Sequence, residues 1–552
     1  MDIHAHLRHL SRRITSLLAA AAILLPTFGV RVAAARPPGA TRGGTLRLGY
    51  TGNFISFDPA QAYIDDWFLV NNALYNGLYQ LDRNGVPQLD LAAAPPVVSA
   101  DRTVWTFRLR RGVLFSNGTE LTAGDVAFSL TRTLDPHLKP AVSWGQTTDT
   151  IFKGAGAFIA GKARGVSGIR VLDRYTIRFV LEHQVAVLPY ILAESFNFVL
   201  PRVLVATESP LEVAGHPVGT GPFVLQAWQK NTDTAVFVRN PRYFRPGLPY
   251  LDRVIIAYNA SSSVLSLRVE KGELDGIGAA TETQAADVQQ ARSDPRYARY
   301  LLAAPSATVT WLNLNVHAAP FTTLALRQAV ALAINRRRLV KLLGGQAQPA
   351  SQLYIPLDPQ HDPQLDRHPV YSYDPQRAAA LVKASGYRGQ QITLLYGSNT
   401  QFEANAVVGL QQDLARVGFN VALRGVTDTT LASLGASFKG SQTTTDFWAA
   451  DYPDGVDLYA SVLACGPNAD GATAAAHYCD PVADGLVDRA GSLALGTARD
   501  DLLRQAQVRQ LQAAARVPLV FLKPIDLVSP KVGGFYYEPI LGWQIANYWV
   551  KP

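Results

Sequence analysis

Apolar and polar residues alternate with a period of two in several short segments of the first half of the chain. Thr45 to Gly49 (TLRLG) and Trp105 to Leu109 (WTFRL) show this pattern, which is typical of half-buried β-strands. Thr122 stands where a helix N-cap is expected, before a run with helical spacing. Together these patterns predict strands over 45–49, 105–109, 234–239 and 254–258, a hairpin over 170–181, and helices over 66–79 and 123–130.

In the second half of the chain, strand patterns alternate with longer helical patterns. The predicted strands cover 308–315, 391–396 and 419–424, and the predicted helices cover 324–343, 373–385 and 404–417. This strand–helix–strand order favours a parallel α/β sheet. With 552 residues, the chain is too long for one ordinary core. We therefore expect two α/β lobes and a smaller mixed subdomain.

The composition is that of a globular protein, with 48% hydrophobic and 17% charged residues. The formal net charge of +8 gives only a weak electrostatic field for a chain of 552 residues. A nucleic-acid-binding surface would need that charge gathered on one face. The one basic cluster, Arg336-Arg337-Arg338, is more simply explained as a solvated helix face. Nucleic acid is therefore not expected as a partner.

The first 35 residues have the features of a secretory signal peptide. Arg8, Arg12 and Arg13 precede an uncharged apolar run, which ends before the small residues Ala33-Ala34-Ala35. A retained membrane anchor is the alternative, but Pro26 interrupts a run that is already short for a membrane span. The pattern predicts cleavage after about residue 35 and a soluble protein in the periplasm or outside the cytoplasm. Whether the general secretory or the twin-arginine route exports it stays open.

The chain has two cysteines, Cys465 and Cys479. An even number of cysteines in an exported protein favours a disulfide, and the predicted compartment is oxidising. The alternative is a zinc site that would also use His477. A structural zinc site needs four ligands, and only three are present here. We expect the disulfide, and no cofactor or metal.

Several stretches, in order along the chain, resemble family 5 of the extracellular solute-binding proteins, which includes the dipeptide- and oligopeptide-binding proteins of ABC importers. The most specific is WTFRLRRGVLFSNGTELTAGDVAFSL, residues 105–130. VGTGPFVLQAW (218–228), RNPRYFRPGLPYLDRV (239–254) and LNLNVHAAPFTTLALRQAVALAINRRRLV (312–340) follow, with weaker matches at 271–276 and 373–387. The matches extend from Gly43 to about Ala490.

The resemblance implies a type II periplasmic-binding-protein fold, an α/β fold with two lobes joined by a hinge and an α+β subdomain inserted in the first lobe. By analogy, the first lobe takes residues 43–81, 217–304 and 523–552, the inserted subdomain takes 82–216, and the second lobe takes 305–522. In this arrangement Gly219 and Gly221 are expected to permit a tight turn of the backbone.

The resemblance also implies ligand-binding residues in DFWAADYPDG, residues 446–455. In oligopeptide-binding members the pattern Trp-x-Ala-Asp-Tyr lies at the cleft, and its Asp pairs with the α-ammonium group of the ligand. Asp451 matches that residue, with Trp448 and Tyr452 beside it. A sheltered carboxylate suits this role, because charge-assisted hydrogen bonds are stronger than neutral ones. The residues that follow, Pro453 to Gly455, depart from the family pattern, so the local loop is expected to differ.

The opposite wall of the cleft is expected in the segment 50–66 of the first lobe. The candidates there are Asn53, Phe54 and Tyr63. Arg424, beside the strand predicted over 419–424, is a candidate partner for a ligand carboxylate, with a surface salt bridge as the alternative.

The resemblance therefore predicts a monomeric, non-enzymatic binding protein that delivers a peptide to membrane permease subunits. No G-x-S-x-G, P-loop or H-E-x-x-H motif occurs in the sequence. A sugar, a metal chelate or an opine-like ligand, or a sensor role without transport, would use the same fold.

Overall fold

The computed structural model describes residues 37–552 apart from 55, 62–67, 139–144, 146–148, 206–209, 278–282, 399–400, 436–439, 466–476 and 541. The predicted signal peptide, the candidate Tyr63 and the start of the helix predicted over 66–79 lie outside these residues. The described residues belong to one compact unit, Pro37–Pro552. Within them, no helix combines the length and the apolar character needed to cross a membrane.

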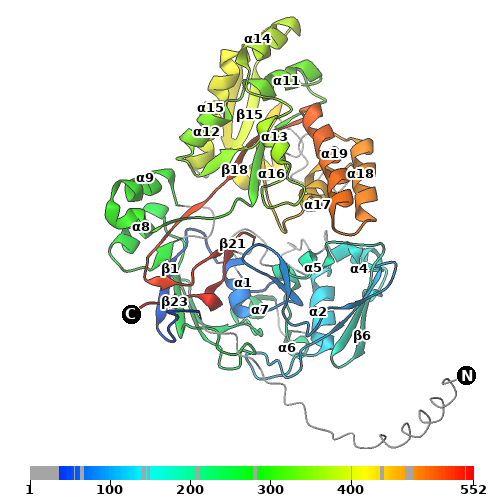
Figure 1. Ribbon diagram of the computed structural model, residues 1–552, viewed down its shortest axis with the longest axis vertical. Helices are drawn as coiled ribbons and strands as arrows, with labels where there is room; N and C mark the ends of the chain where they lie inside the picture. Colours follow the sequence, from blue (N-terminus) through cyan, green and yellow to red (C-terminus); the bar gives the residue numbers. More distant parts are fainter. Residues whose placement is uncertain are drawn as a thin grey trace, which may run out of the picture. The chain divides into compact units, whose positions relative to one another are not determined.

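A seven-stranded mixed sheet forms the centre of what we call the first lobe (Figure 1). The predicted strand over 45–49 is β1 (Thr45–Gly49), which pairs in parallel with β10 and β11. In sheet order the strands are β12 (Leu301–Ala303), β19 (Ile525–Val528), β11 (Gly276–Ile277), β1, β10 (Arg253–Ala257), β9 (Thr234–Arg239) and β8 (Phe223–Gln229). Helices α1 (Phe68–Leu74), α8 (Ser262–Glu270), α9 (Ala285–Ser293) and α10 (Pro295–Ala298) are also part of this lobe. Helix α1 ends at Leu74, before the end of the helix predicted over 66–79, and strand β2 (Tyr79–Leu81) begins at the last residue of that prediction.

A four-stranded antiparallel sheet forms the centre of the inserted subdomain, whose strands lie between β1 and β8 in the sequence. The hairpin predicted over 170–181 is present as β6 (Ile169–Asp173) and β7 (Thr176–Val180). Its remaining strands are β4 (Val97–Val98) and β5 (Val104–Arg108), and its helices are α2 (Ala123–Thr133), α4 (Ala155–Ile159), α5 (Leu188–Ile191), α6 (Arg202–Val205) and α7 (Pro210–Gly215). Thr122 caps α2 in a capping box with Asp125, as the sequence predicts.

Gly219 and Gly221 are needed for close packing and not for a turn. A Cβ atom on Gly219 would lie 2.1 Å from the carbonyl oxygen of Leu74, and one on Gly221 would lie 2.3 Å from the carbonyl carbon of Leu74. Neither residue has a positive φ. The backbone does bend at residues 220–222, but this bend does not depend on the conformational freedom of glycine, and the lack of a side chain is what the structure uses.

The second lobe is built on a six-stranded sheet with the order β14–β18–β13–β17–β15–β16. The prediction of a parallel sheet is correct only in part. Strand β15 (Ile392–Gly397) is parallel to β16 (Val421–Val426) and β17 (Thr443–Ala449), but β13 (Thr308–Leu314) is antiparallel to its neighbours β17 and β18. The other strands are β14 (Ala347–Pro349) and β18 (Arg516–Leu522), which are also antiparallel to each other.

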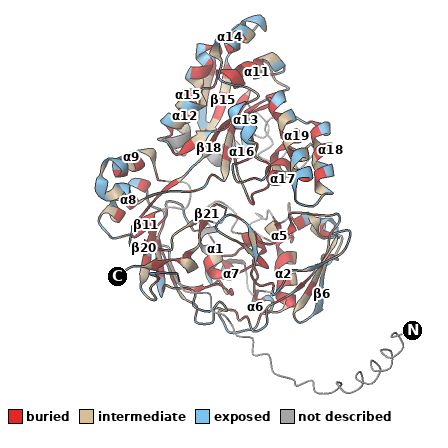
Figure 2. Cartoon of the chain, viewed as in Figure 1, coloured by how far each residue is buried: buried red, intermediate tan, exposed pale blue. Residues whose placement is uncertain are grey.

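Helices cover both faces of this sheet, so β13 supplies residues to two cores. Val309 and Trp311 belong to one core, and Leu312 and Leu314 belong to the other. The helices α11 (Leu324–Ala333), α12 (Arg336–Leu342), α14 (Pro375–Ala384) and α15 (Gln401–Arg416) lie on one side, and α17 (Gly455–Leu458), α18 (Pro481–Gly491) and α19 (Thr497–Ala513) on the other (Figure 1). Figure 2 shows the buried residues on the helix faces that are turned toward the sheet. Two short helices, α13 (Pro363–Arg367) and α16 (Asp428–Gly435), complete the lobe.

The single helix predicted over 324–343 is two helices, and that prediction was wrong. The break comes at Ile334 and Asn335. The Asn335 side chain accepts a hydrogen bond from the backbone N–H of Arg338 and caps α12, while Asp413 accepts the backbone N–H of Asn335 at 3.0 Å. These polar contacts favour a helix start inside an apolar pattern that would otherwise continue.

Two adjacent segments connect the first and second lobes. One runs from β12 to β13 through residues 304–307, and the other runs from β18 to β19 through Lys523 and Pro524. The backbone N–H of Ala304 donates to the carbonyl oxygen of Pro524 at 2.8 Å. Because both segments are short and lie side by side, they are where a hinge between the lobes would bend.

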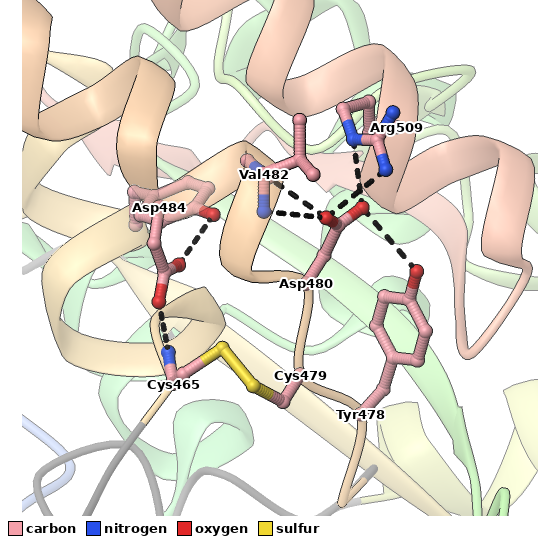
Figure 3. Close-up of a disulfide and its surroundings, with 9 residues drawn as sticks. Cys465, Tyr478, Cys479, Asp480, Val482, Asp484 and Arg509 are labelled. Carbon is pink, nitrogen blue, oxygen red and sulfur yellow. Dashed lines mark hydrogen bonds and ion pairs between the residues drawn. A yellow bond between two sulfur atoms is a disulfide. The ribbon is translucent and has the colours of Figure 1, made fainter.

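The predicted disulfide between Cys465 and Cys479 is present (Figure 3). Next to it, Asp484 accepts the backbone N–H of Cys465 at 2.9 Å, and Asp480 caps α18 and pairs with Arg509 of α19. The zinc alternative is wrong, because both sulfur atoms are used in the disulfide. A closed loop of this size stabilises a fold by about 3 kcal/mol through the entropy of the unfolded chain.

Candidate functional site

The predicted site is the segment DFWAADYPDG, residues 446–455, which covers the last residues of β17 and the loop that follows. In β17, successive side chains point to opposite faces. Phe447 is 46% exposed, whereas Trp448 is buried in the core that contains Trp311. The strand continues for one more bond, as the backbone N–H of Ala450 donates to the carbonyl oxygen of Ala307 at 2.9 Å. The chain then turns at Asp451, directly beside the segment that connects the lobes.

Asp457, on α17, holds this turn in place. Its Oδ2 atom accepts hydrogen bonds from Trp448 Nε1 at 2.7 Å and from the backbone N–H of Asp451 at 3.0 Å. Burial raises the pKa of Asp457 well above its ordinary value, the negative charge of Asp451 raises it further, and these two hydrogen bonds oppose the shift. Asp451 itself is 5% exposed. Asp457 therefore positions a second carboxyl group that is also sheltered from water.

Asp454 is the third carboxylate of this segment, and its partners are all protein groups. Arg499 of α19 donates to both of its oxygens at 2.7 Å, in a bidentate ion pair with both side chains buried. Gln360 adds a hydrogen bond at 3.2 Å, and Asp454 also accepts the backbone N–H of Val456 as the N-cap of α17. This carboxylate belongs to the scaffold of the site.

Tyr452 and Pro453 bring the loop against the rest of the molecule. Tyr452 is buried in the core of the inserted subdomain, and its ring centroid lies 5.9 Å from that of Tyr190 at α5. Pro453 lies over the β2–β3 turn, between Tyr79–Leu81 and Pro87–Leu89, where a Cβ atom on Gly85 would be 3.2 Å from Pro453 Cγ. The segment is thus the point where the second lobe contacts the inserted subdomain.

Glu194, on the inserted-subdomain side of this contact, is a residue that the sequence reasoning missed. It lies between α5 and the 3₁₀ turn Ser195–Asn197 and is 2% exposed. Neither of its carboxyl oxygens has a hydrogen-bond partner in the described part of the chain. Burial raises the pKa of Glu194 well above its ordinary value, and the charges of Asp451 and Asp457 add to this. A lone acid in the apolar run VLPYILAESF was the available signal.

The other predicted residues do not gather around Asp451. Phe54 lies in the first-lobe core, where its ring centroid is 5.1 Å from that of Tyr258 and 5.5 Å from that of Phe57. Asn53 is exposed. Arg424 is exposed on β16, the edge strand, and β15 separates it from β17. The structure thus groups Trp448, Asp451 and Tyr452 from the predicted set, whereas Phe54 packs as scaffold and Tyr63 lies outside the described residues.

The turn gathers three acidic side chains, Asp451, Asp454 and Asp457, that are all sheltered from water. In the described ranges, no group of three or more His, Cys, Asp or Glu side chains is arranged to hold a metal ion. A cavity of about 10 Å³ beneath the loop, lined by Trp448, Asp454 and Asp457 among others, has room for no more than one water molecule. A buried carboxyl group needs a positive partner, hydrogen-bond donors or a proton. Asp454 has its arginine, Asp457 has two donors, and the raised pKa of Asp457 and Glu194 favours the proton.

Comparison with known proteins places this geometry in a wider context. The family of bacterial extracellular solute-binding proteins, family 5 (middle region), matches residues 86–470. The glutathione-binding protein GsiB of Escherichia coli (strain K12) is 26% identical over 509 residues, covering 90% of this chain and 92% of that protein. Di/tripeptide-binding protein 2 of Pseudomonas aeruginosa (strain UCBPP-PA14) is 31% identical over 383 residues, covering 66% of this chain and 69% of the relative.

Among solved structures, the periplasmic binding protein DppA of Helicobacter pylori, in complex with the peptide STSA, is similar over 93% of this chain and 99% of its own. The TM-score is 0.76 at 24% sequence identity. A likeness at this level of identity concerns the fold, and it confirms the predicted type II periplasmic-binding-protein fold.

Proposed function

Because the chain belongs to family 5 of the bacterial extracellular solute-binding proteins, the ligand-capturing components of ABC importers, we propose that it captures short peptides with a free amino group. It then delivers them to membrane permease subunits. The relatives named for glutathione and for di- and tripeptides support a peptide ligand. The protein acts as a monomer outside the cytoplasm, after loss of residues 1–35, and binds its ligand without chemical change.

The observation that carries this proposal is the acidic turn after Trp448, in which Asp457 accepts hydrogen bonds from Trp448 Nε1 and from the backbone N–H of Asp451. Asp451 presents its carboxylate to the ligand's α-ammonium group. Asp454 is paired with Arg499, and Asp457 orients the backbone of Asp451, so each of the three acids has its own role. An ion pair in such a sheltered place is much stronger than one in water.

The loop also suits capture by closure. It touches the inserted subdomain through Tyr452 and starts beside the connection at Ala307. A ligand bound here contacts both sides and shifts the equilibrium toward the closed arrangement, in proportion to its preference for that state. X-ray scattering in solution should show smaller dimensions for the loaded protein than for the empty one.

The experiment is calorimetric titration of trialanine and N-acetyl-trialanine into the wild-type protein and the Asp451→Asn variant. The protein is first freed of co-purified ligand by unfolding and refolding. We expect trialanine to bind the wild-type protein. Acetylation and the Asp451→Asn change should each weaken binding by about 2–5 kcal/mol, or roughly 30- to 4,000-fold, because each removes one side of the ion pair.

Asp488→Asn is the matched control, since this exposed acid lies on α18 in the same lobe. It should leave the affinity unchanged. Equal binding of the free and acetylated peptides would remove the ammonium from the proposal. A sugar, a metal chelate or an opine-like compound identified by mass spectrometry of the native protein would replace the peptide. Hydrolysis of the peptide would contradict a purely binding role.

A further inference from the structure

Glu194 has an environment that the proposed ion pair with Asp451 does not explain. The chain around it is apolar: Leu192 and Ala193 belong to the core of the inserted subdomain, and Phe196 is also buried. Glu194 directly precedes the 3₁₀ turn Ser195–Asn197, yet its side chain does not cap that turn. Among the residues that the structure describes, neither carboxyl oxygen has a donor, which is costly for a group that is only 2% exposed.

The charges around Glu194 are negative. Those acting on it most strongly are the carboxylates of Asp451, Asp457, Asp149 and Glu538, with Asp451 first. Asp454, which has its own arginine, is not one of them. The tyrosine contact between residues 190 and 452, with ring centroids 5.9 Å apart, brings the two sides together four residues before Glu194, and Asp451 is the charge that acts on Glu194 most strongly.

One ammonium group balances one carboxylate. If Asp451 receives the α-ammonium of a peptide, Glu194 remains buried and without a cation, which is strongly unfavourable for an ionised carboxyl group. A second positive charge close to the first removes that penalty. In a peptide, the nearest group that can carry it is the side chain of the first residue.

We infer that Glu194 is a ligand-binding residue that selects peptides whose first residue has a cationic side chain, as lysine, ornithine and arginine do. This inference rests on the proposed function, because it assigns the first positive charge to Asp451. It adds a second acidic subsite, contributed by the inserted subdomain, and with it a specificity for basic amino-terminal residues.

The test compares Lys-Ala-Ala with norleucyl-Ala-Ala, which has the same carbon chain without the terminal ammonium group. We expect the wild-type protein to bind the lysyl peptide about tenfold or more tightly at pH 7.5, which corresponds to one charge-assisted contact. Glu194→Gln should reduce this preference to about twofold or less. Glu194→Asp, which keeps the charge, should retain part of it, and Glu273→Gln, at an exposed acid of the first lobe, should retain all of it.

The outcomes separate this inference from the proposed function. Equal affinity of the wild-type protein for the two peptides, with loss of both on acetylation, would overturn the role of Glu194 and leave Asp451 in place. A norleucyl peptide that gains affinity as the pH falls would also overturn it, since Glu194 would then bind as a neutral acid. Failure of either peptide to bind would overturn both. If Glu194→Gln does not fold, Glu194→Asp replaces it: a lysyl preference that is fully retained in Glu194→Asp and in Glu273→Gln alike would overturn the role of Glu194, and a smaller preference in Glu194→Asp alone would support it.

Discussion

Asp454 and Glu194 are two buried carboxyl groups on opposite sides of the same contact, and their surroundings differ completely. Asp454 is 3% exposed and has a bidentate arginine, a glutamine and a backbone N–H as partners. Glu194 is 2% exposed and has no donor among the residues that the structure describes. A buried acid with its own cation is part of the fold, whereas Glu194, with neither a cation nor a donor in the described part of the chain, is where we infer that a ligand's charge belongs.

The largest expected effect comes from removing the cation of Asp454. Arg499→Met should lower the free energy of unfolding by about 3–5 kcal/mol, because it leaves a buried carboxylate uncompensated. Urea denaturation at pH 7 measures this change. The double variant Arg499→Met/Asp454→Asn should recover a large part of the loss. A loss below about 1 kcal/mol would mean that the fold accommodates Asp454 without a cation, as it accommodates Glu194. The two carboxyl groups would then not differ in their need for a cation.

The fold could be predicted from the sequence where local patterns decide it. Strand β1 and helix α2 follow from period and capping residues that lie within the elements themselves. The break at Asn335 does not, because Asp413 stabilises it from a distant part of the chain. For the same reason strand direction in the six-stranded sheet was only partly predicted, since β13 and β18 come together from the two ends of the lobe.

The site divides in the same way. Trp448, Asp451 and Tyr452 could be proposed because they stand together in one motif that resembles a known family. Glu194 could not, because nothing in its own segment shows that a loop some 250 residues later will face it. Phe54 was expected at the cleft, but an apolar ring in an aromatic segment packs equally well in a core, and it does so here.

The second prediction concerns the stability of the ligand-free protein as a function of pH. Burial raises the pKa of Glu194 well above its ordinary value and that of Asp149 to about 7. An acid with a higher pKa in the folded state holds more protons there than in the unfolded chain. The stability that these two acids contribute is therefore largest at low pH and falls as the pH rises from about 4, with the part due to Asp149 lost through about pH 7.

Glu194→Gln should raise the free energy of unfolding by about 1–3 kcal/mol at pH 8, because it removes a buried acid that lacks partners. It should also make the decline of stability with pH shallower, and the remaining slope belongs to the other buried acids with a raised pKa, which include Asp149, Asp457, Asp358 and Asp446. Thermal or urea unfolding of ligand-free protein between pH 5 and pH 8 measures both effects. If the variant follows the wild-type curve throughout, Glu194 is ionised or solvated without cost, and its contrast with Asp454 loses its basis.

The smallest expected effect tests whether the large contribution of the Asp454–Arg499 pair to the free energy of unfolding comes from its burial or from ion pairing as such. Arg268 of α8 pairs with Glu273 at 3.3 Å, but the two side chains are 37% and 51% exposed. Water and salt screen such a pair, and ordering two long side chains offsets most of its attraction. Arg268→Met should therefore change the free energy of unfolding by no more than about 0.5 kcal/mol, with little difference between low and high salt. Urea denaturation could instead show that Arg268→Met loses as much free energy of unfolding as Arg499→Met. Ion pairing alone would then explain both losses, burial would not matter, and the lack of a partner at buried Glu194 would no longer point to a ligand.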